Sequence, residues 1–129
     1  MSALVPIGRV LFALIFLAAS PRHFSAEGIG HAAELGVPLA SVLVPLSGLM
    51  AIAGALSIAT GFKARWGAWL IVLFLVPITF SMHAFWALSD PLQVHLQQAM
   101  FMKNLSMLGA ALLLTHFGAG PWSFDARRR

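Results

Sequence analysis

Four long runs of apolar residues, almost free of charge, are the feature that most constrains this chain. They cover residues 4–20, 38–62, 66–88 and 96–117. A helix needs about 20 apolar residues to cross about 30 Å of hydrocarbon, and each run reaches or approaches that length. No run alternates apolar and polar residues as the strands of a membrane barrel do. We therefore predict that residues 1–129 form a single transmembrane domain, an all-α, integral membrane four-helix bundle.

The overall composition agrees with this prediction and excludes several other classes of protein. Of the 129 residues, 60% are hydrophobic and only 9% are charged. An ordinary soluble domain has about a quarter of its residues charged. The chain has no cysteine, so it supplies no thiolate metal site and no iron–sulfur cluster. The net charge of +4 comes from a few basic residues at the edges of the apolar runs, which is not the pattern of a nucleic-acid partner.

The positions of the basic residues predict how the four spans are oriented. An even number of spans places both termini on one side of the membrane, together with Lys63, Arg65 and the tail 124–129 with its three arginines. The opposite side has a different set of charged residues: Arg22, Glu27, Glu34 and Asp90. By the positive-inside rule both termini are then cytoplasmic. We expect a multi-pass protein of a bacterial-type inner (plasma) membrane, with the lipid bilayer and either a partner subunit or a second copy of the chain as its neighbours.

Two ionisable residues inside the predicted spans suggest a polar pocket. His83 lies near the end of the third span and Lys103 near the start of the fourth, so both lie about 7–10 Å below the outer interface at the helical rise. Charged groups at such depth are costly and suggest function or pairing. Four further residues would complete the pocket: Trp86, Gln97, Gln98 and Asn104. In the alternative interpretation Lys103 snorkels outward and His83 bonds a helix carbonyl.

Haem and metal ions are weaker candidates. His83 and His116 lie on the order of 20 Å apart along the membrane normal, so they cannot ligate one haem from two sides. A possible zinc or copper set lies in the outer connection, where a short interfacial helix is plausible: His23, Glu27, His31 and Glu34. Gly28 and Gly30 weaken that helix, and charged faces are usually only solvated. We therefore expect no metal, with this set as the alternative.

Two further patterns have structural interpretations. Arg9 in the first span and Asp125 after the fourth should lie at the same depth, which predicts a structural ion pair. Alternatively, Arg9 snorkels to the interface. In the second span small residues recur every four positions at 47, 51, 55 and 59, with Gly48 and Gly54 beside them. Small faces let membrane helices approach closely. This face could pack inside the bundle or form a homodimer contact.

Several short motifs, taken in order, resemble the DoxX family of small four-helix membrane proteins. They are Gly8-Arg9, Leu35-Gly36-Val37-Pro38, His83-Ala84-Phe85-Trp86, Lys103-Asn104-Leu105 and Ser123-Phe124-Asp125-Ala126. The resemblance implies a redox role, since the related DoxD protein is a membrane subunit of a thiosulfate:quinone oxidoreductase. It also places Phe85 with Trp86 among the functional residues.

These observations give a leading hypothesis and an alternative. The leading hypothesis is an inner-membrane protein of a redox assembly that binds a quinone in an outer-leaflet pocket. His83 would exchange protons and Lys103 would polarise a carbonyl, as the catalytic pair. The ligand would be held by Phe85, Trp86, Gln98 and Asn104, and another subunit would donate electrons.

The alternative is a non-catalytic scaffold or assembly subunit of a larger membrane complex, in which these polar residues only fix helix register. A small transporter is a third possibility, made less attractive by the lack of an inverted repeat.

Overall fold

The computed structural model describes residues 2–128, and every regular element within them is helical. The elements are α1 (Leu4–Ala19), η1 (Ser20–Phe24), α2 (Ala26–Glu34), α3 (Ala40–Thr60), α4 (Ala64–Met82), η2 (Phe85–Ala87), α5 (Pro91–Phe117) and α6 (Phe124–Arg127). The prediction of an all-α protein is confirmed for this part of the chain. The short helix expected in the outer connection is α2.

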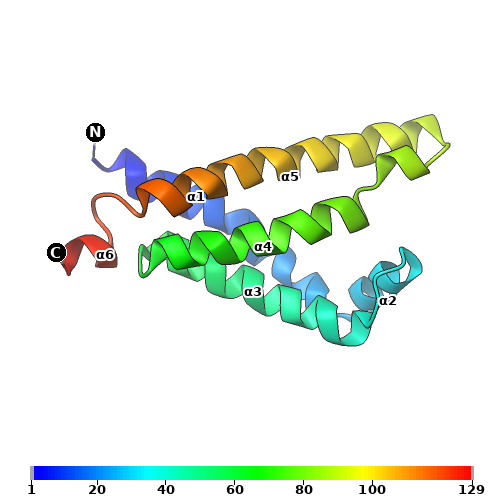
Figure 1. Ribbon diagram of the computed structural model, residues 1–129, viewed down its shortest axis with the longest axis horizontal. Helices are drawn as coiled ribbons and strands as arrows, with labels where there is room; N and C mark the ends of the chain where they lie inside the picture. Colours follow the sequence, from blue (N-terminus) through cyan, green and yellow to red (C-terminus); the bar gives the residue numbers. More distant parts are fainter. Residues whose placement is uncertain (1, 129) are drawn as a thin grey trace.

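Four long helices lie side by side, and the chain enters and leaves at the same end of them (Figure 1). Helix α3 packs between α1 and α4, and α4 packs against α5. From the end that holds both termini, helices α1 and α5 diverge toward the other end of the bundle (Figure 1). We call these the terminal end and the cavity end. The cavity end takes its name from a cavity that residues of both helices line.

Three helical segments are long and apolar enough to cross a membrane: Leu4–Phe24, Ala40–Thr60 and Ala64–Ala87. Helix α5 has 27 residues and is about 40 Å long at the helical rise, so its length also suffices. Its composition is more polar, because it carries Lys103, Asn104 and three glutamines. Three of the four predicted spans therefore correspond to helices that are able to cross a membrane, and the fourth stays a prediction. The structure also has shorter helices that a simple four-helix bundle does not include.

The small residues of α3 pack inside the bundle. Ala51 and Ala55 belong to the buried core, together with Phe16 of α1 and Ile71 of α4. A Cβ added at Gly54 would lie 2.9 Å from the carbonyl oxygen of Gly67 and from the Ile71 side chain. Close helix approach, and not a homodimer contact, therefore accounts for this pattern.

Helix α4 ends earlier than predicted. The predicted span runs to residue 88, but the helix stops at Met82 and His83 leaves the helical region with φ −127° and ψ 41°. The following turn places Phe85 and Trp86 against Phe101 of α5, with ring centroids 5.5 and 5.7 Å away. His83 therefore lies at a helix end, where its side chain is directed by the turn and not by helical periodicity.

Candidate functional site

A cavity of about 620 Å³ lies at the cavity end, where α1 and α5 diverge. Residues from six helices line it: α1, η1, α2, α3, α4 and α5. Much of the wall is apolar, but nine residues are polar or charged: Arg22, His23, His31, Ser47, Ser81, His83, Gln97, Lys103 and Asn104. Sites for small molecules typically occupy about 300–1,000 Å³ and combine apolar walls with a few polar groups. This cavity has both properties.

The first polar wall comes from the end of α4 and one face of α5. Gln97, Met100, Asn104 and Met107 line the cavity at spacings of three and four residues, which place them on one side of a helix. His83 Nδ1 lies 2.8 Å from Gln97 Oε1. An amide oxygen only accepts, so Nδ1 carries the proton in this arrangement. Within residues 2–128, no hydrogen bond is made by Nε2 of the same ring.

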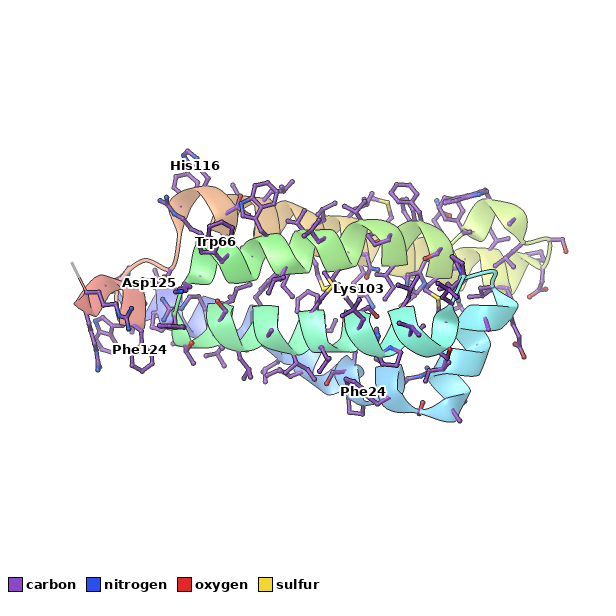
Figure 2. The ribbon with its side chains drawn as sticks, turned by 60° about the horizontal axis from the view of Figure 1, so that its bottom comes forward. Phe24, Trp66, Lys103, His116, Phe124 and Asp125 are labelled. Carbon is purple, nitrogen blue, oxygen red and sulfur yellow. The ribbon has the colours of Figure 1, made fainter. Side chains whose placement is uncertain are left out.

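Lys103 and Asn104 have incomplete sets of partners in this wall. The Lys103 ammonium contacts only the weakly accepting thioether of Met100, at 3.4 Å. Asn104 is 5% exposed, yet its side-chain amide makes no hydrogen bond to the part of the chain that the structure describes. The fully buried side-chain atoms without a partner in the described chain are Arg9 Nε and Thr79 Oγ1, so the Asn104 amide keeps some access, and Asn104 lines the cavity. Figure 2 shows Lys103 between the long helices, far from the labelled residues of the terminal end.

A second polar wall, opposite the first, was not predicted. His23 of η1 places Nδ1 2.9 Å from Ser47 Oγ and 3.3 Å from the Val44 carbonyl oxygen. The Ser47 hydroxyl itself donates to Val44 O at 2.6 Å, so it must accept from His23 and Nδ1 carries the proton. His23 and His83, two of the three histidines that line the cavity, therefore share one tautomer when neutral. Each then has Nε2 free to accept a hydrogen bond from a ligand.

Gly48 is the sequence signal for this second wall. A Cβ there would lie 2.6 Å from the His23 Cβ and 2.9 Å from the Phe24 ring, so only glycine lets η1 approach α3 this closely. The sequence shows Gly48 as one of several small residues, and it does not show which segment fills the space above it. His23 therefore could not be paired with Ser47 before the fold was known.

Three residues predicted to hold the ligand lie outside the cavity wall. Phe85 and Trp86 instead form an aromatic cluster with Phe80 and Phe101, and Trp86 is 58% exposed. Gln98 is one helical step beyond Gln97, which turns its side chain by about 100° to another face of α5. These three residues lie off the cavity wall because α4 ends at Met82 and because Gln97, not Gln98, lines the cavity, and their role in holding a ligand stays a prediction.

The alternative metal set of the outer connection does not come together. Ser25 separates η1 from α2, and it caps α2 by accepting from Gly28 N at 3.0 Å. His23 consequently turns toward Ser47, while Glu27 lies 3.9 Å from Arg22 on the surface. Among residues 2–128 no three histidines or carboxylates gather as a metal site.

The predicted ion pair between Arg9 and Asp125 is also wrong, although both residues lie at the terminal end. The buried Arg9 guanidinium donates to the carbonyl oxygens of Ala119, Pro121 (3.1 Å) and Trp122 (2.7 Å). The three carbonyls belong to the segment after α5, and a planar guanidinium with several donors suits them.

Asp125 has a different task. Its two carboxylate oxygens accept from the backbone N–H groups of Lys63 (2.7 Å) and Ala64 (2.9 Å). These are orphan donors at the start of α4, where Lys63 offers no side-chain cap. Asp125 therefore caps α4 from a distance in sequence, and its own N–H donates to Gly61 O at 2.9 Å.

The apolar helices and the cavity between them define an all-helical membrane protein with an internal cavity. The model of the SURF4 family matches residues 2–129, so the chain belongs to the SURF4 family. The resemblance to the DoxX family is thus wrong as a family assignment. The motifs that suggested it are short, and none of them is specific by itself.

Two proteins of Escherichia coli strain K12 are similar to this chain over nearly its whole length. The inner membrane protein YphA is 29% identical over 126 residues, covering 96% of this chain and 89% of that protein. The inner membrane protein YqjF is 30% identical over 123 residues, covering 94% of this chain and 88% of that protein. No solved structure matches the chain significantly.

Proposed function

We propose that this protein is a multi-pass inner-membrane protein that binds the head group of a quinone in the 620 Å³ cavity of the cavity end. The observation that carries the proposal is Asn104, a buried amide that faces the cavity without a protein partner among residues 2–128. A ligand carbonyl would supply the missing acceptor. The names of the two E. coli relatives support the location in an inner membrane.

The residues of the cavity fit a quinone chemically. A quinone head group offers carbonyl oxygens as acceptors on a flat apolar ring. Asn104 and Lys103 are donors on the first wall, and Lys103 lacks a strong acceptor of its own within residues 2–128. Apolar side chains such as Phe74, Met100 and Met107 would contact the ring and the start of its tail. This donor set supports quinone binding without the resemblance to the DoxX family.

Each polar group then has a distinct role, and a bound quinone would supply two-electron, two-proton chemistry. Lys103 would polarise a carbonyl oxygen through its positive charge. His83 would hold or release a proton at Nε2, while Gln97 keeps the ring oriented through Nδ1. Histidine suits this task because imidazole exchanges protons near neutral pH. His83 and Lys103 stay the proposed catalytic residues, and a partner subunit would donate the electrons.

The distribution of charge supports a cavity in the outer leaflet. The terminal end of the bundle carries Lys63, Arg65, Arg127 and Arg128, whereas three of the four acidic residues lie toward the cavity end. The positive-inside rule then places the terminal end in the cytoplasm. Both termini would be cytoplasmic, and the cavity end would face the outer side.

A thermal-shift experiment tests the proposal. Ubiquinone-1, a short-tailed quinone, is titrated into the protein in mild detergent, and the unfolding temperature is followed. A ligand that binds only the folded state raises stability by about 2.7 kcal/mol at one hundred times its Kd. We expect a saturable rise that is lost in His83→Leu and Lys103→Met. His116→Leu is the matched control, because His116 is exposed on α5 and outside the cavity. No shift in the unchanged protein would refute quinone binding.

The scaffold alternative loses part of its support. It needed the small-residue face of α3 as a docking surface, but that face packs inside the bundle against α4 and η1. A scaffold would still give a recognisable result in the same experiment. The protein would migrate with a larger complex, and no quinone would alter its unfolding temperature.

A further inference from the structure

A second cavity, of about 460 Å³, lies at the terminal end of the bundle. It is formed where the α3–α4 turn meets the segment that links α5 to α6. Its lining includes two basic side chains, Lys63 and Arg65, and two large aromatic ones, Trp66 and Phe117. Figure 2 shows Trp66 and Asp125 at this end, remote from Lys103. The proposed quinone site uses none of these residues.

The two basic side chains have no carboxylate within ion-pair distance in the part of the chain that the structure describes. Across residues 2–128 the one such pair is Arg22 with Glu27, at the opposite end. Asp125 also lines this cavity, but its carboxylate oxygens already accept from two backbone N–H groups. The Lys63 ammonium lies 5.8 Å from the centre of the Phe62 ring, and the Arg65 guanidinium lies over Gly118. Two positive charges therefore face one cavity, and residues 2–128 give them no anionic partner of their own.

Gly118 lies next to Arg65, and its backbone conformation shapes the cavity. Gly118 ends α5 with φ +78°, a conformation that L side chains rarely adopt. A Cβ there would also lie 3.2 Å from Arg65 Nε. The chain thus turns sharply at the end of α5 and leaves room for the arginine to lie along the cavity.

The aromatic walls point to an amphiphilic occupant. Trp66 is 74% exposed and Phe117 is 72% exposed, and both lie at the ends of long apolar helices. Aromatic residues at this level mark the boundary between head groups and hydrocarbon. A small soluble anion has no apolar part that could contact these aromatic side chains, whereas an acyl chain would pack along them.

We propose that this cavity binds the phosphate head group of an anionic phospholipid, with Lys63 and Arg65 as its ligands. Arginine and lysine form strong, charge-assisted bonds to phosphate oxygens. Basic residues close to an anionic membrane surface are attracted to it, so two of them favour an anionic lipid over a neutral one. Trp66 and Phe117 would contact the glycerol region and the first part of the acyl chains. The positions of Arg127 and Arg128 in the following helix and turn add to the positive field at this end.

Retention of lipid by the purified protein tests this proposal. The protein is reconstituted in nanodiscs of phosphatidylglycerol and phosphatidylcholine, extracted again, and analysed for tightly bound lipid by mass spectrometry. We expect phosphatidylglycerol to be enriched on the unchanged protein. The double variant Lys63→Asn/Arg65→Gln should retain about tenfold less, following the loss of two attractive charges. Asparagine is chosen because Lys63 has φ +49°, which asparagine tolerates.

Controls separate a specific site from general charge and from misfolding. Arg22→Gln removes an exposed positive charge at the other end, and retention should not change. Arg65→Lys keeps the charge and should restore most of the retention that Arg65→Gln loses. Unfolding temperatures show whether each variant is folded. Equal retention of phosphatidylglycerol by the double variant and the unchanged protein would overturn the proposal. Equally tight binding of glycerol 3-phosphate, which has the phosphate without acyl chains, would overturn the assignment to lipid.

Discussion

The two ends of the bundle differ in how their polar side chains are hydrogen-bonded. At the terminal end Arg9 and Asp125 are bonded to backbone groups of other segments, and they fix the chain after α5 to α1 and to the start of α4. At the cavity end Asn104 has no partner within residues 2–128, and Lys103 has only a thioether. Most buried polar groups are bonded, so the set that bonds to backbone groups is structural, although Arg9 Nε itself has no partner. The set with few partners is available to a ligand.

Replacement of Arg9 by Met should have the largest effect on stability. Three carbonyl oxygens would lose a charged donor, and hydrogen bonds to charged groups contribute about 1.5–3 kcal/mol each. We expect a loss of about 3 kcal/mol or more, seen as a lower unfolding temperature and a poorer yield of folded protein. Arg22→Met, at an exposed arginine, should have little effect. An unfolding temperature unchanged by Arg9→Met would show that these bonds do not hold the terminal end together.

Changes at Asp125 should be graded, because each carboxylate oxygen accepts one bond. Asp125→Ala removes both bonds to the start of α4, and losing a helix N-cap costs about 0.5–2 kcal/mol. Asp125→Asn keeps one accepting oxygen and should lose roughly half as much. Glu34→Gln, at an exposed acidic residue, is the control. Thermal unfolding measures the series, and equal losses for Ala and Asn would contradict capping by both oxygens.

Asn104→Leu should separate stability from binding at the cavity end. Removing an amide that has no hydrogen-bond partner among residues 2–128 should leave the unfolding temperature unchanged or raise it, because no protein hydrogen bond is lost. Quinone affinity should fall about tenfold with the loss of one well-placed hydrogen bond. Gln98→Leu, on another face of α5, should alter neither property. Binding that survives Asn104→Leu but fails in Gln98→Leu would show that Gln98 contacts the quinone and that Asn104 does not.

Ser47→Ala should have the smallest effect. His23 would keep only the longer contact to Val44 O, and a neutral hydrogen bond contributes about 0.5–1.5 kcal/mol. We expect the affinity for ubiquinone-1 to fall about threefold, because the His23 imidazole ring is held less firmly in its orientation. Thr115→Val, which removes a hydroxyl that bonds within α5, is the control. An affinity that responds equally to both changes would exclude a specific role for the second wall.

The sequence predicts the apolar helices and part of the cavity for simple reasons. Helix length follows from the apolar runs, and the similar depths of His83, Lys103 and Asn104 follow from their positions near the α4–α5 connection. All three residues do line one cavity. Their function stays a proposal.

The remaining features depend on backbone that sequence patterns do not reveal. Arg9 and Asp125 have the expected depth, but loop carbonyls and helix-end N–H groups are closer partners than each other's side chain. Trp86 faces away from the cavity because α4 ends at Met82 and a short turn follows. His23 reaches Ser47 only because Gly48 lets η1 lie against α3. Each case depends on a turn whose course is set by tertiary packing.

The central claim is that a quinone binds at the cavity end, through groups that have no partners among residues 2–128. The small molecules that co-purify with the protein test this claim most directly. The measurement is mass spectrometry of every small molecule that co-purifies with the protein in mild detergent. We predict a near-stoichiometric quinone on the unchanged protein and on Gln98→Leu, and a strongly reduced amount on Asn104→Leu and His83→Ala. Purified protein that carries bulk lipid alone, or a quinone retained equally by all four proteins, would contradict quinone binding at these groups.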